Sequence, residues 1–429
     1  MDSSDLPLPF IPYGCQSIDA SDLQAVSEAL TLSHITRGPT VEAFEHAIAQ
    51  YCGVAYAVAM NSGSTALNAA YHAAQTGPYD RIISTPISFV ASINGGTRYG
   101  ATPVFVDIDR NTGQFDLDQV GVYLKEEKLS RGKNIITAVH LAGIPVDMQK
   151  LDSLICDPNA IVIEDAAHAI GSRYKDGQMV GCCAWSHMTV FSFHPVKTIT
   201  TGEGGMVLTN DPELYRRLLL FRNNGIERAP ERFEGDSADR YLGYYEVTDA
   251  TGNYNFTEFQ AALGLSQLKR IDHFIQKRRD LMGYYRQLLQ DMEHIKLFNG
   301  DMDHLVAFHI CVIQIDFEKY GITRAEVIEA LTARGIGTQV HYIPIYRHPS
   351  FKKVCGDISE YFPRTEKYFA EALTLPLYAD LQKSDVDRVV ATLQVVLNEG
   401  KRHKHGHDHS VSKPEGHRRP TKHIRKNRR

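Results

Sequence analysis

The chain has 429 residues, 43% of them hydrophobic, which is enough to bury a large core and favours two domains. The formal net charge is −5, but residues 401–429 carry about +9, so the remaining body is near −14. This acidic body argues against a nucleic-acid-binding domain. No stretch approaches the roughly 18 apolar residues of a membrane helix. The first residues lack the basic-then-apolar pattern of a signal peptide.

The seven cysteines are scattered, and no C-x-x-C pair occurs among them. An odd count without such spacing predicts neither a disulfide framework nor a zinc site. We therefore expect no metal site in the folded body and a reducing, cytoplasmic location.

The first two-thirds of the chain alternate short apolar runs with helical patterns. Helices are expected over 22–31, after an N-cap at Ser21, and over 41–51, after an N-cap at Thr40. Several apolar runs are unbroken and rich in Val and Ile, as in strands buried on both faces. This alternation predicts an α/β layer structure with a mostly parallel sheet. The seven expected strands cover residues 55–60, 81–85, 103–107, 135–140, 160–164, 188–193 and 205–209.

From about residue 265 the pattern changes to that of a smaller α+β domain. A charged helical stretch covers roughly 258–292, and an alternating segment follows at 305–316. A helix at 324–334, a strand at 336–341 and a last helix at 384–398 complete it. We predict an N-terminal arm over 1–35, a large domain over 36–265 and a small domain over 266–399.

The last segment, 400–429, is basic, rich in histidine and almost without apolar residues. It cannot offset the entropy cost of ordering, so we predict a disordered tail. Its alternating histidines could hold Ni²⁺ or Zn²⁺, which leaves open a non-catalytic metal-binding scaffold that acts through the tail; the competing interpretation is a solvated polar tail. These histidines are His403, His405, His407 and His409.

Chemistry-bearing residues follow the ends of the expected strands, where ligands bind in open α/β sheets. Asp165 comes directly after the fifth strand, and a buried carboxylate needs a cationic partner such as a protonated pyridine nitrogen. A helix N-cap is the ordinary alternative for this residue. Lys197 follows the sixth strand and precedes a Gly-rich turn. Burial lowers the pKa of a lysine and prepares it to form a Schiff base, whereas most loop lysines simply face solvent.

Two further segments complete this pattern. Ser62, Gly63 and Ser64 lie between a strand and a helix, where free backbone N–H groups can cradle a phosphate. Phe89 follows the second strand and could stack on a cofactor ring, although such a residue is more often part of a core. Each signal alone is modest, but their joint order at strand ends matches the requirements of pyridoxal 5'-phosphate (PLP) chemistry.

From Pro12 to Leu397 the chain resembles the DegT/DnrJ/EryC1/StrS family of PLP-dependent sugar aminotransferases. The motifs that carry the resemblance are PISFVAS, EDAAHAIGS, FSFHPVKTITTGEGG and QVHYIPIY. The resemblance implies the α/β fold type I architecture of aspartate aminotransferase, with a mostly parallel seven-stranded sheet in the large domain. It also implies a homodimer whose active sites are each built from two chains.

The resemblance also implies roles for individual residues. Lys197 would form the Schiff base, Asp165 would pair with the pyridine nitrogen, and Phe89 would lie against the ring. His168 would approach the ring hydroxyl, and Asn253 would reach the phosphate of the partner subunit's cofactor. The phosphate and its neighbouring oxygens would contact Ser62, Gly63, Ser64 and Ser192. The nucleotide-sugar pocket would be lined by Tyr13, Ser33, His34, Ile35, Thr36, Gln339, Val340, His341 and Tyr342. A core strand end is the other interpretation of His341 and Tyr342, and Asn255 stands where the family usually has Arg.

The implied reaction is a ping-pong transfer of an amino group from L-glutamate to a UDP-linked keto-sugar. The motifs are most similar to the branch that forms UDP-4-amino-4,6-dideoxy-N-acetyl-L-altrosamine, a step toward pseudaminic acid. Alternatives are another nucleotide keto-sugar, such as a 3-keto sugar or a 4-amino-arabinose precursor, and a PLP-dependent sugar dehydratase. Those dehydratases replace the lysine with histidine, so the presence of Lys197 argues against the last.

Overall fold

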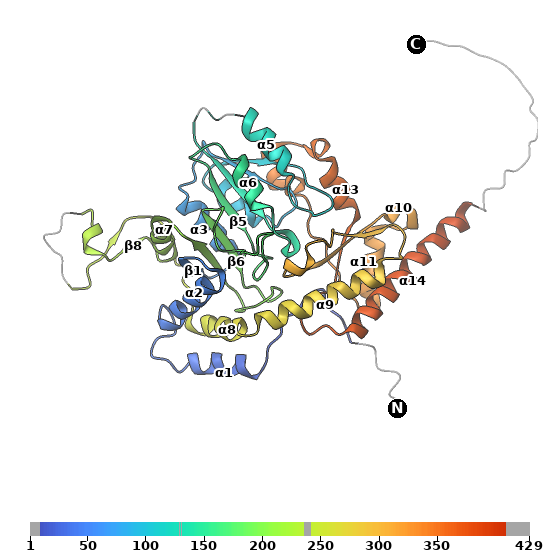
Figure 1. Ribbon diagram of the computed structural model, residues 1–429, viewed down its shortest axis with the longest axis horizontal. Coiled ribbons are helices and arrows are strands. Elements are labelled where there is room, and N and C mark those ends of the chain that lie inside the picture. The colour runs from blue at the N-terminus through green and yellow to red at the C-terminus, as the bar shows by residue number, and fades with distance from the viewer. Residues whose placement is uncertain (1–8, 128, 130, 236–241, 409–429) are drawn as a thin grey trace, which may run out of the picture.

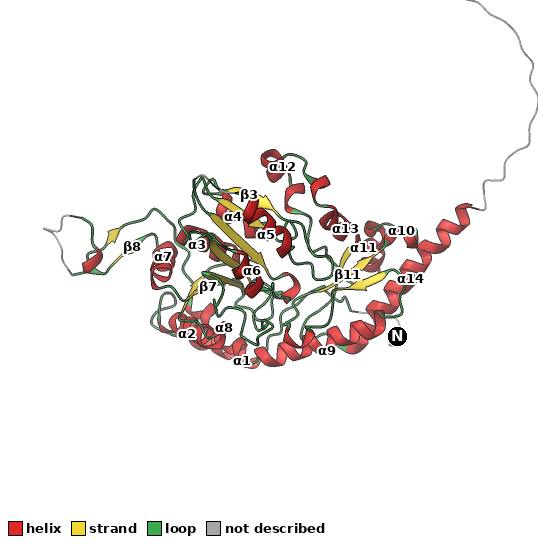
Figure 2. Ribbon diagram, turned by 45° about the horizontal axis from the view of Figure 1, so that its top comes forward, coloured by secondary structure: helices red, strands yellow, loops and turns green. Residues whose placement is uncertain are grey.

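The computed structural model describes residues 9–127, 129, 131–235 and 242–408, with side chains described up to Arg402. Its centre is a seven-stranded sheet of order β1-β7-β6-β5-β4-β2-β3 (Figures 1 and 2). β7 is antiparallel to both of its neighbours, and the other four pairings are parallel, so the predicted α/β architecture is confirmed. The strands are β1 (Tyr56–Met60), β2 (Arg81–Ser84), β3 (Thr102–Phe105), β4 (Asn134–Val139), β5 (Ile161–Asp165), β6 (Met188–Ser192) and β7 (Gly205–Thr209).

Helices cover both faces of this sheet. Alternate strand residues point to opposite sides, so each strand contributes side chains to two apolar clusters. In β1, Ala57 and Ala59 belong to one apolar cluster, whereas Val58 and Met60 belong to another. The first cluster includes side chains of α2 (Pro39–Cys52), α5 (Leu117–Glu126), α6 (Met148–Leu154) and α8 (Glu258–Leu268). The second includes side chains of α3 (Gly63–Ala73), α4 (Ala91–Thr97) and α7 (Pro212–Arg222).

A second, antiparallel sheet follows the long helix α9 (Ile271–Leu289) in the chain and lies at the right of Figure 1. It pairs β10 (Ile295–Leu297), β11 (Cys311–Ile315) and β12 (Ala372–Leu375) in that order. Arg278 of α9 is 1% exposed and donates hydrogen bonds to the carbonyl oxygens of His309 and Leu377, at 3.0 and 2.9 Å. The accompanying helices are α10 (Phe317–Tyr320), α11 (Arg324–Ala333), α13 (Pro363–Glu371) and α14 (Lys383–Asp408), whereas α12 (Pro349–Cys355) packs Phe351 into the second apolar cluster of the central sheet.

The starts of the first two helices differ from the prediction. α1 (Ala20–Ala29) begins after Asp19, whose carboxylate accepts from the N–H groups of Ser21 and Asp22, so Ser21 is not the N-cap. α2 begins after Gly38 and not after Thr40. The acceptor for its first N–H groups comes from a residue far away in the sequence: the Glu258 carboxylate accepts from the N–H groups of Gly38 and Thr40 at 2.8 and 2.9 Å.

The segment 336–341 is not a strand. It forms only two isolated bridges, from Ile336 to Ile11 and from Gln339 to Thr374. Its backbone bonds are divided between two partners: Gly337 N–H donates to Ile11 O, whereas Gln339 and Thr374 exchange two bonds, at 3.2 and 2.7 Å. The chain then turns toward the cavity described below, so no ladder develops.

The last helix is longer than predicted. α14 continues to Asp408, well past the expected end at 398, so the predicted disorder does not begin at residue 400. Residues 409–429 of the predicted tail lie outside the described residues. At the opposite end of the molecule, β8 (Ile226–Glu227) and β9 (Glu246–Val247) form a small hairpin that projects from the body (Figure 1). Among the helices of the described ranges, none combines the length and hydropathy needed to cross a bilayer.

Candidate active site

A cavity of about 1210 Å³ lies at the carboxyl ends of the central strands and is also lined by His309 and by the segments 339–343 and 348–351. It brings together residues that the chain separates by more than 300 positions. Most of the predicted site residues line it: Tyr13, Ser62, Gly63, Ser64, Phe89, Asp165, His168, Ser192, Lys197, Gln339, Val340, His341 and Tyr342. Residues that were not predicted also line it, among them Ser88, Asn94, His194, Glu203, His309 and His348.

The floor of the cavity contains the N-terminus of α3. Ser62 is its N-cap, and the Ser62 hydroxyl oxygen accepts from the N–H of Thr65 at 3.1 Å. The N–H groups of the first turn have no partner within the helix, so they can bind an anion. A Cβ on Gly63 would lie 2.8 Å from Cβ of Ser192, and one on Gly205 would lie 2.4 Å from the carbonyl oxygen of Ser62. The close approach that these glycines permit forms a compact cradle, which fits a phosphate group.

Lys197 lies in the turn after β6, with its backbone N–H bonded to the carbonyl oxygen of His194 at 2.9 Å. Burial lowers the pKa of Lys197 to about 8, although the negative charge of Asp165 opposes this shift. Within the described part of the chain, its ammonium group has no hydrogen-bond or ion-pair partner. A lysine of this kind is partly neutral near neutral pH and can attack a carbonyl carbon.

Asp165 is the last residue of β5 and is 5% exposed. Its Oδ2 accepts from the hydroxyl of Ser92 at 2.5 Å, and its Oδ1 accepts from the N–H of Ala167 at 3.2 Å. Ser92 is itself fully buried, lies 2.5 Å from the hydroxyl of Ser88, and bonds to the carbonyl oxygen of Phe89 at 3.0 Å. Ser92 was not predicted as a site residue, and its only sequence signal is its place at the end of the PISFVAS motif.

Phe89 and three histidines line a further part of the cavity. The Phe89 side chain is 56% exposed, so its ring is available to contact a bound molecule. The rings of His168 and His309 are 4.3 Å apart, and burial together with the charge of Lys197 holds the pKa of both well below the usual range. The same causes lower the pKa of His341 to about 3. These imidazoles are therefore neutral, and His309 is one that the sequence did not single out.

Hydrogen bonds define the protonated nitrogen of His168. The N–H of Ala142 donates to Nδ1 of His168 at 3.3 Å, so the neutral ring carries its proton on Nε2. That Nε2 lies 3.1 Å from the hydroxyl oxygen of Tyr342 and donates to it. Burial raises the pKa of Tyr342 above its ordinary value, so its hydroxyl keeps its proton and remains a donor.

The remaining predicted residues, Asn253 and the segment 33–36, do not line this cavity. They lie near one another instead, because Thr36 bridges Thr257 and Asn223 bridges Asn253. A separate cavity of about 370 Å³ beside them is lined by Arg37, Asn223 and Asn255, together with four other arginines. The prediction that residues 33–36 and 339–342 share one pocket therefore does not hold within a single chain.

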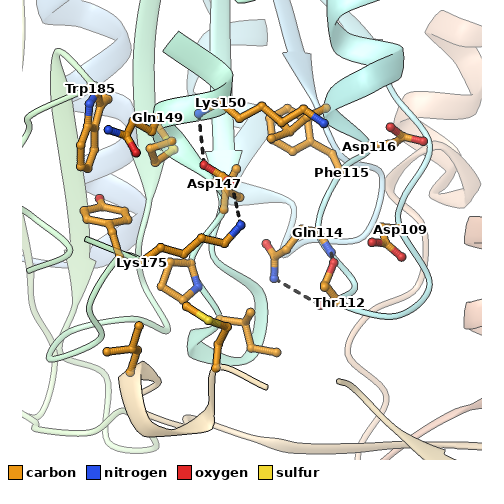
Figure 3. A pocket seen from close by; sticks show the side chains of 18 of the residues that line it. Asp109, Thr112, Gln114, Phe115, Asp116, Asp147, Gln149, Lys150, Lys175 and Trp185 are labelled. Carbon is orange, nitrogen blue, oxygen red and sulfur yellow. Dashed lines mark hydrogen bonds and ion pairs between the residues drawn. The ribbon is translucent and has the colours of Figure 1, made fainter. Parts of the chain in front are cut away.

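A third cavity, of about 490 Å³, lies between the starts of α5 and α6 and contains none of the predicted site residues (Figure 3). Its charged side chains are largely paired with each other. Lys175 Nζ lies 2.7 Å from Asp147 Oδ2, and Lys150 Nζ lies 2.6 Å from Asp118 Oδ1. We do not assign it chemistry.

The main cavity joins a reactive amine, a buried carboxylate, an exposed ring and an anion-binding turn. Covalent capture of pyridoxal phosphate requires these groups, and each residue that provides one projects into the same space. The class of protein that this fold and site define is a PLP-dependent enzyme.

The chain belongs to the DegT/DnrJ/EryC1/StrS aminotransferase family, whose pattern matches residues 16–394. It is 36% identical over 392 residues to the spore coat polysaccharide biosynthesis protein SpsC of Bacillus subtilis, covering 90% of this chain and 97% of that protein. Its fold is similar to that of Helicobacter pylori PseC, an aminotransferase involved in pseudoaminic acid biosynthesis. That comparison has a TM-score of 0.81 and 29% identity, covering 91% of this chain and all of PseC.

A structure of the sugar aminotransferase Spr1654 of Streptococcus pneumoniae in its PLP form is also similar. Its TM-score is 0.80 at 26% identity, with 91% of this chain and 99% of that chain covered. The protein is thus a PLP-dependent sugar aminotransferase, and the predicted cofactor is confirmed.

Proposed function

We propose that this enzyme transfers an amino group from L-glutamate to the C4 keto group of a UDP-linked 4-keto-6-deoxy-N-acetylhexosamine, for a surface glycan of the pseudaminic acid type. The observation that carries the proposal is the single cavity that contains Lys197, Asp165 and the Ser62–Ser64 turn. The likeness to PseC supports the sugar, and the likeness to SpsC supports a role in polysaccharide biosynthesis.

Each group in the cavity would hold a different part of the cofactor. Lys197 would bind its aldehyde carbon, and Asp165 would face the pyridine nitrogen. Phe89 would stack on the ring, and His168 would approach the ring hydroxyl through its Nε2–H. The phosphate would occupy the cradle formed by Ser62, Gly63, Ser64 and Ser192.

When bound, PLP supplies an electron sink that stabilises negative charge at the carbon from which a proton is removed. The protein's part is proton transfer and orientation. Once the donor amine has displaced it, Lys197 is a free amine whose pKa near 8 suits both proton removal and proton return. It would move the proton between Cα of the donor and C4′ of the cofactor, and the keto-sugar would react by the reverse steps.

The sugar nucleotide would occupy the part of the cavity that lies toward the second sheet. Tyr13, Gln339 and His341 line that end, and the Tyr13 ring lies 5.8 Å from that of His341. The Tyr342 hydroxyl is a donor there that could bind a sugar oxygen.

A panel of keto-sugars tests this proposal. The protein is incubated with PLP, L-glutamate and, separately, UDP-linked 4-keto-6-deoxy-N-acetylhexosamines, 3-keto sugars and a 4-amino-arabinose precursor. We expect amination at C4 of a 4-keto-6-deoxy-N-acetylhexosamine, identified by mass spectrometry and NMR. Turnover of another sugar alone would overturn the assigned substrate, and the family assignment would stand. Deletion of residues 401–429, followed by measurement of both transamination and zinc binding, tests the tail. Loss of zinc binding alone would mean that the tail is an accessory to the enzyme.

We further propose that the enzyme is a cytoplasmic homodimer. All seven cysteines are free, which suits a reducing compartment. Asn253, whose implied partner is a cofactor phosphate, does not line the cavity of its own chain, so a second copy is needed for that contact.

Ser92→Ala is expected to slow the donor half-reaction roughly tenfold to a hundredfold, since hydrogen bonds to charged groups contribute on the order of 1.5–3 kcal/mol. Without the Ser92 hydroxyl, a proton shared between Asp165 and the ring nitrogen moves toward the carboxylate. Because the ring would then be less positive, the nitrogen that joins Lys197 to the cofactor should have a higher pKa. The measurement is the visible band of the lysine-bound cofactor as a function of pH. Ser92→Thr keeps the hydroxyl and should restore both properties, and a wild-type titration in Ser92→Ala would refute the role.

A further inference from the structure

The main cavity is poor in positive charge for the anions that it is proposed to hold. Among the described residues that line it, Lys197 is the only lysine or arginine, and it is accompanied by the acids Asp165 and Glu203. PLP carries a phosphate and UDP carries a diphosphate, and Lys197 is used for the covalent bond. Buried phosphate groups are normally paired with cations. The cation is therefore expected from outside this set of residues.

An unpaired cation lies beside the residues that were left outside the cavity. Five arginines line the 370 Å³ cavity, and two of them are neutralised: Arg222 by Glu45 at 2.5 Å and Arg216 by Glu227 at 3.4 Å. Within the described ranges Arg37, Arg228 and Arg232 have no ion pair; Arg228 lies over the Tyr245 ring, and Arg37 bonds to Asn223. Arg37 is exposed, and over the described ranges it has no carboxylate partner. Its one hydrogen bond, at 3.4 Å, runs to the side-chain oxygen of Asn223.

The backbone around Arg37 is held firmly although the side chain is free. Arg37 has a φ of 52°, in the left-handed region that non-glycine residues rarely adopt. The residue before it bridges Thr257, and the N–H of Gly38 after it bonds to the Glu258 carboxylate at 2.8 Å. Strained residues persist where the surroundings over-determine them, and they are frequent at binding sites. The Arg37 side chain therefore extends from a backbone segment that is held in place.

An asparagine network joins Arg37 to Asn253. The side-chain amide of Asn255 donates to Oδ1 of Asn253 at 2.7 Å and to Oδ1 of Asn223 at 3.2 Å. The backbone N–H of Asn255 also donates to Oδ1 of Asn253, at 3.2 Å. Two donors on that oxygen fix the orientation of the Asn253 amide, so its NH₂ group faces away from Asn255. Asn253 is exposed, and it can therefore donate to a group outside its own chain.

We propose that Arg37 adds a positive charge beside Asn253, and that one copy of the chain supplies this guanidinium group to a phosphate in the main cavity of a second copy. This inference rests on the proposed homodimer. The ligand is a phosphate oxyanion, either the phosphate of PLP or the diphosphate of the nucleotide sugar. The guanidinium offers two parallel N–H donors, and the Asn253 amide offers a third.

The test is a hybrid dimer of two differently tagged chains, one carrying Lys197→Ala and the other Arg37→Ala, isolated by two successive affinity steps. The only lysine-bearing site of the hybrid receives a native Arg37 if this residue acts in trans. PLP affinity is read from the visible band of the lysine-bound cofactor, and UDP affinity from the change that UDP causes in that band. Both readings report on the lysine-bearing site alone.

We expect the Arg37→Ala homodimer to lose about tenfold in affinity for PLP or for UDP, in keeping with the loss of one charge-assisted contact. A loss of affinity for PLP would identify the cofactor phosphate as the ligand of Arg37, and a loss of affinity for UDP would identify the diphosphate. The hybrid should regain wild-type affinity at one site per dimer. Arg37→Lys, which keeps the charge without the paired donors, should lie between the two. The matched control is Arg131→Ala, an exposed arginine stacked on Tyr79, which should behave as wild type.

Several results would overturn the inference. A hybrid that binds as weakly as the Arg37→Ala homodimer would place Arg37 in the site of its own chain. Wild-type affinities for both PLP and UDP in the Arg37→Ala homodimer would remove its role altogether. In both cases the transaminase proposal would stand, since it does not require Arg37. A wild-type protein that is monomeric, or that forms no visible band with PLP, would instead contradict the proposed function itself.

Discussion

Replacing Lys197 with alanine is expected to abolish the visible band of the lysine-bound cofactor and to reduce transamination by at least about a thousandfold. The side chain has two tasks, covalent capture and proton transfer, and general acid–base catalysis alone contributes roughly a hundredfold to ten-thousandfold. Its pKa of about 8, lowered by burial, makes it effective in both tasks.

The measurement is single-turnover conversion of PLP by L-glutamate, with the cofactor followed by absorbance. Lys197→Arg is an informative companion, because it keeps a positive charge and most of the volume but provides no nucleophile, and it should be equally inactive. Lys175→Ala, at an exposed lysine paired with Asp147, serves as the control and should retain full activity. Turnover of keto-sugar with glutamate by purified Lys197→Ala protein would show that the assignment is wrong.

Asp165→Asn is expected to slow the donor half-reaction on the order of a hundredfold to a thousandfold, since breaking a buried charge pair by removing one partner costs about 3–5 kcal/mol. Asparagine has nearly the same shape, but its single carbonyl oxygen can accept from Ser92 or from the N–H of Ala167 and not from both, so the change removes the charge and one of these hydrogen bonds. Without the carboxylate, the ring nitrogen loses the partner that keeps it protonated, and the ring becomes a weaker electron sink.

The half-reaction rate and the PLP dissociation constant should be measured together. We expect both to change in Asp165→Asn and the rate to recover partly in Asp165→Glu, which restores the charge at a longer reach. A rate within a few fold of wild type in Asp165→Asn would mean that the carboxylate does not face the ring nitrogen. Asp165 would then be a structural residue that binds the N–H of Ala167.

Much of the site was predictable because its residues follow strands that the sequence marks clearly. Asp165, Lys197 and the Ser62–Ser64 turn each come at the end of an apolar run, and parallel strands bring such ends to one edge. Ser92 and His309 were not recognised for a different reason. A buried serine or a single histidine in an apolar segment has no local signature, and its role depends on what lies opposite it in space, such as Oδ2 of Asp165.

Errors in the second sheet and in the caps have the same origin. β12 was not predicted because four residues between a helix and a proline carry too little periodicity, and it forms by pairing with β11. The segment 336–341 resembles a strand locally, yet its backbone partners are Ile11 and Thr374 on either side. Thr40 has the side chain of an N-cap, but the Glu258 carboxylate, more than 200 positions away, binds the start of α2 instead.

The sequence by itself determined the α/β architecture and the candidate cofactor-binding residues at the strand ends, because strand burial and helix N-termini are encoded over a few neighbouring residues. The tertiary structure decided which of those residues share a cavity. It separated Asn253 and residues 33–36 from Lys197 and placed them beside Arg37, which no local pattern distinguishes. The physical reason is that a phosphate site depends on net charge and on donors converging in space, and these depend on contacts between distant segments and, under our proposal, between two chains.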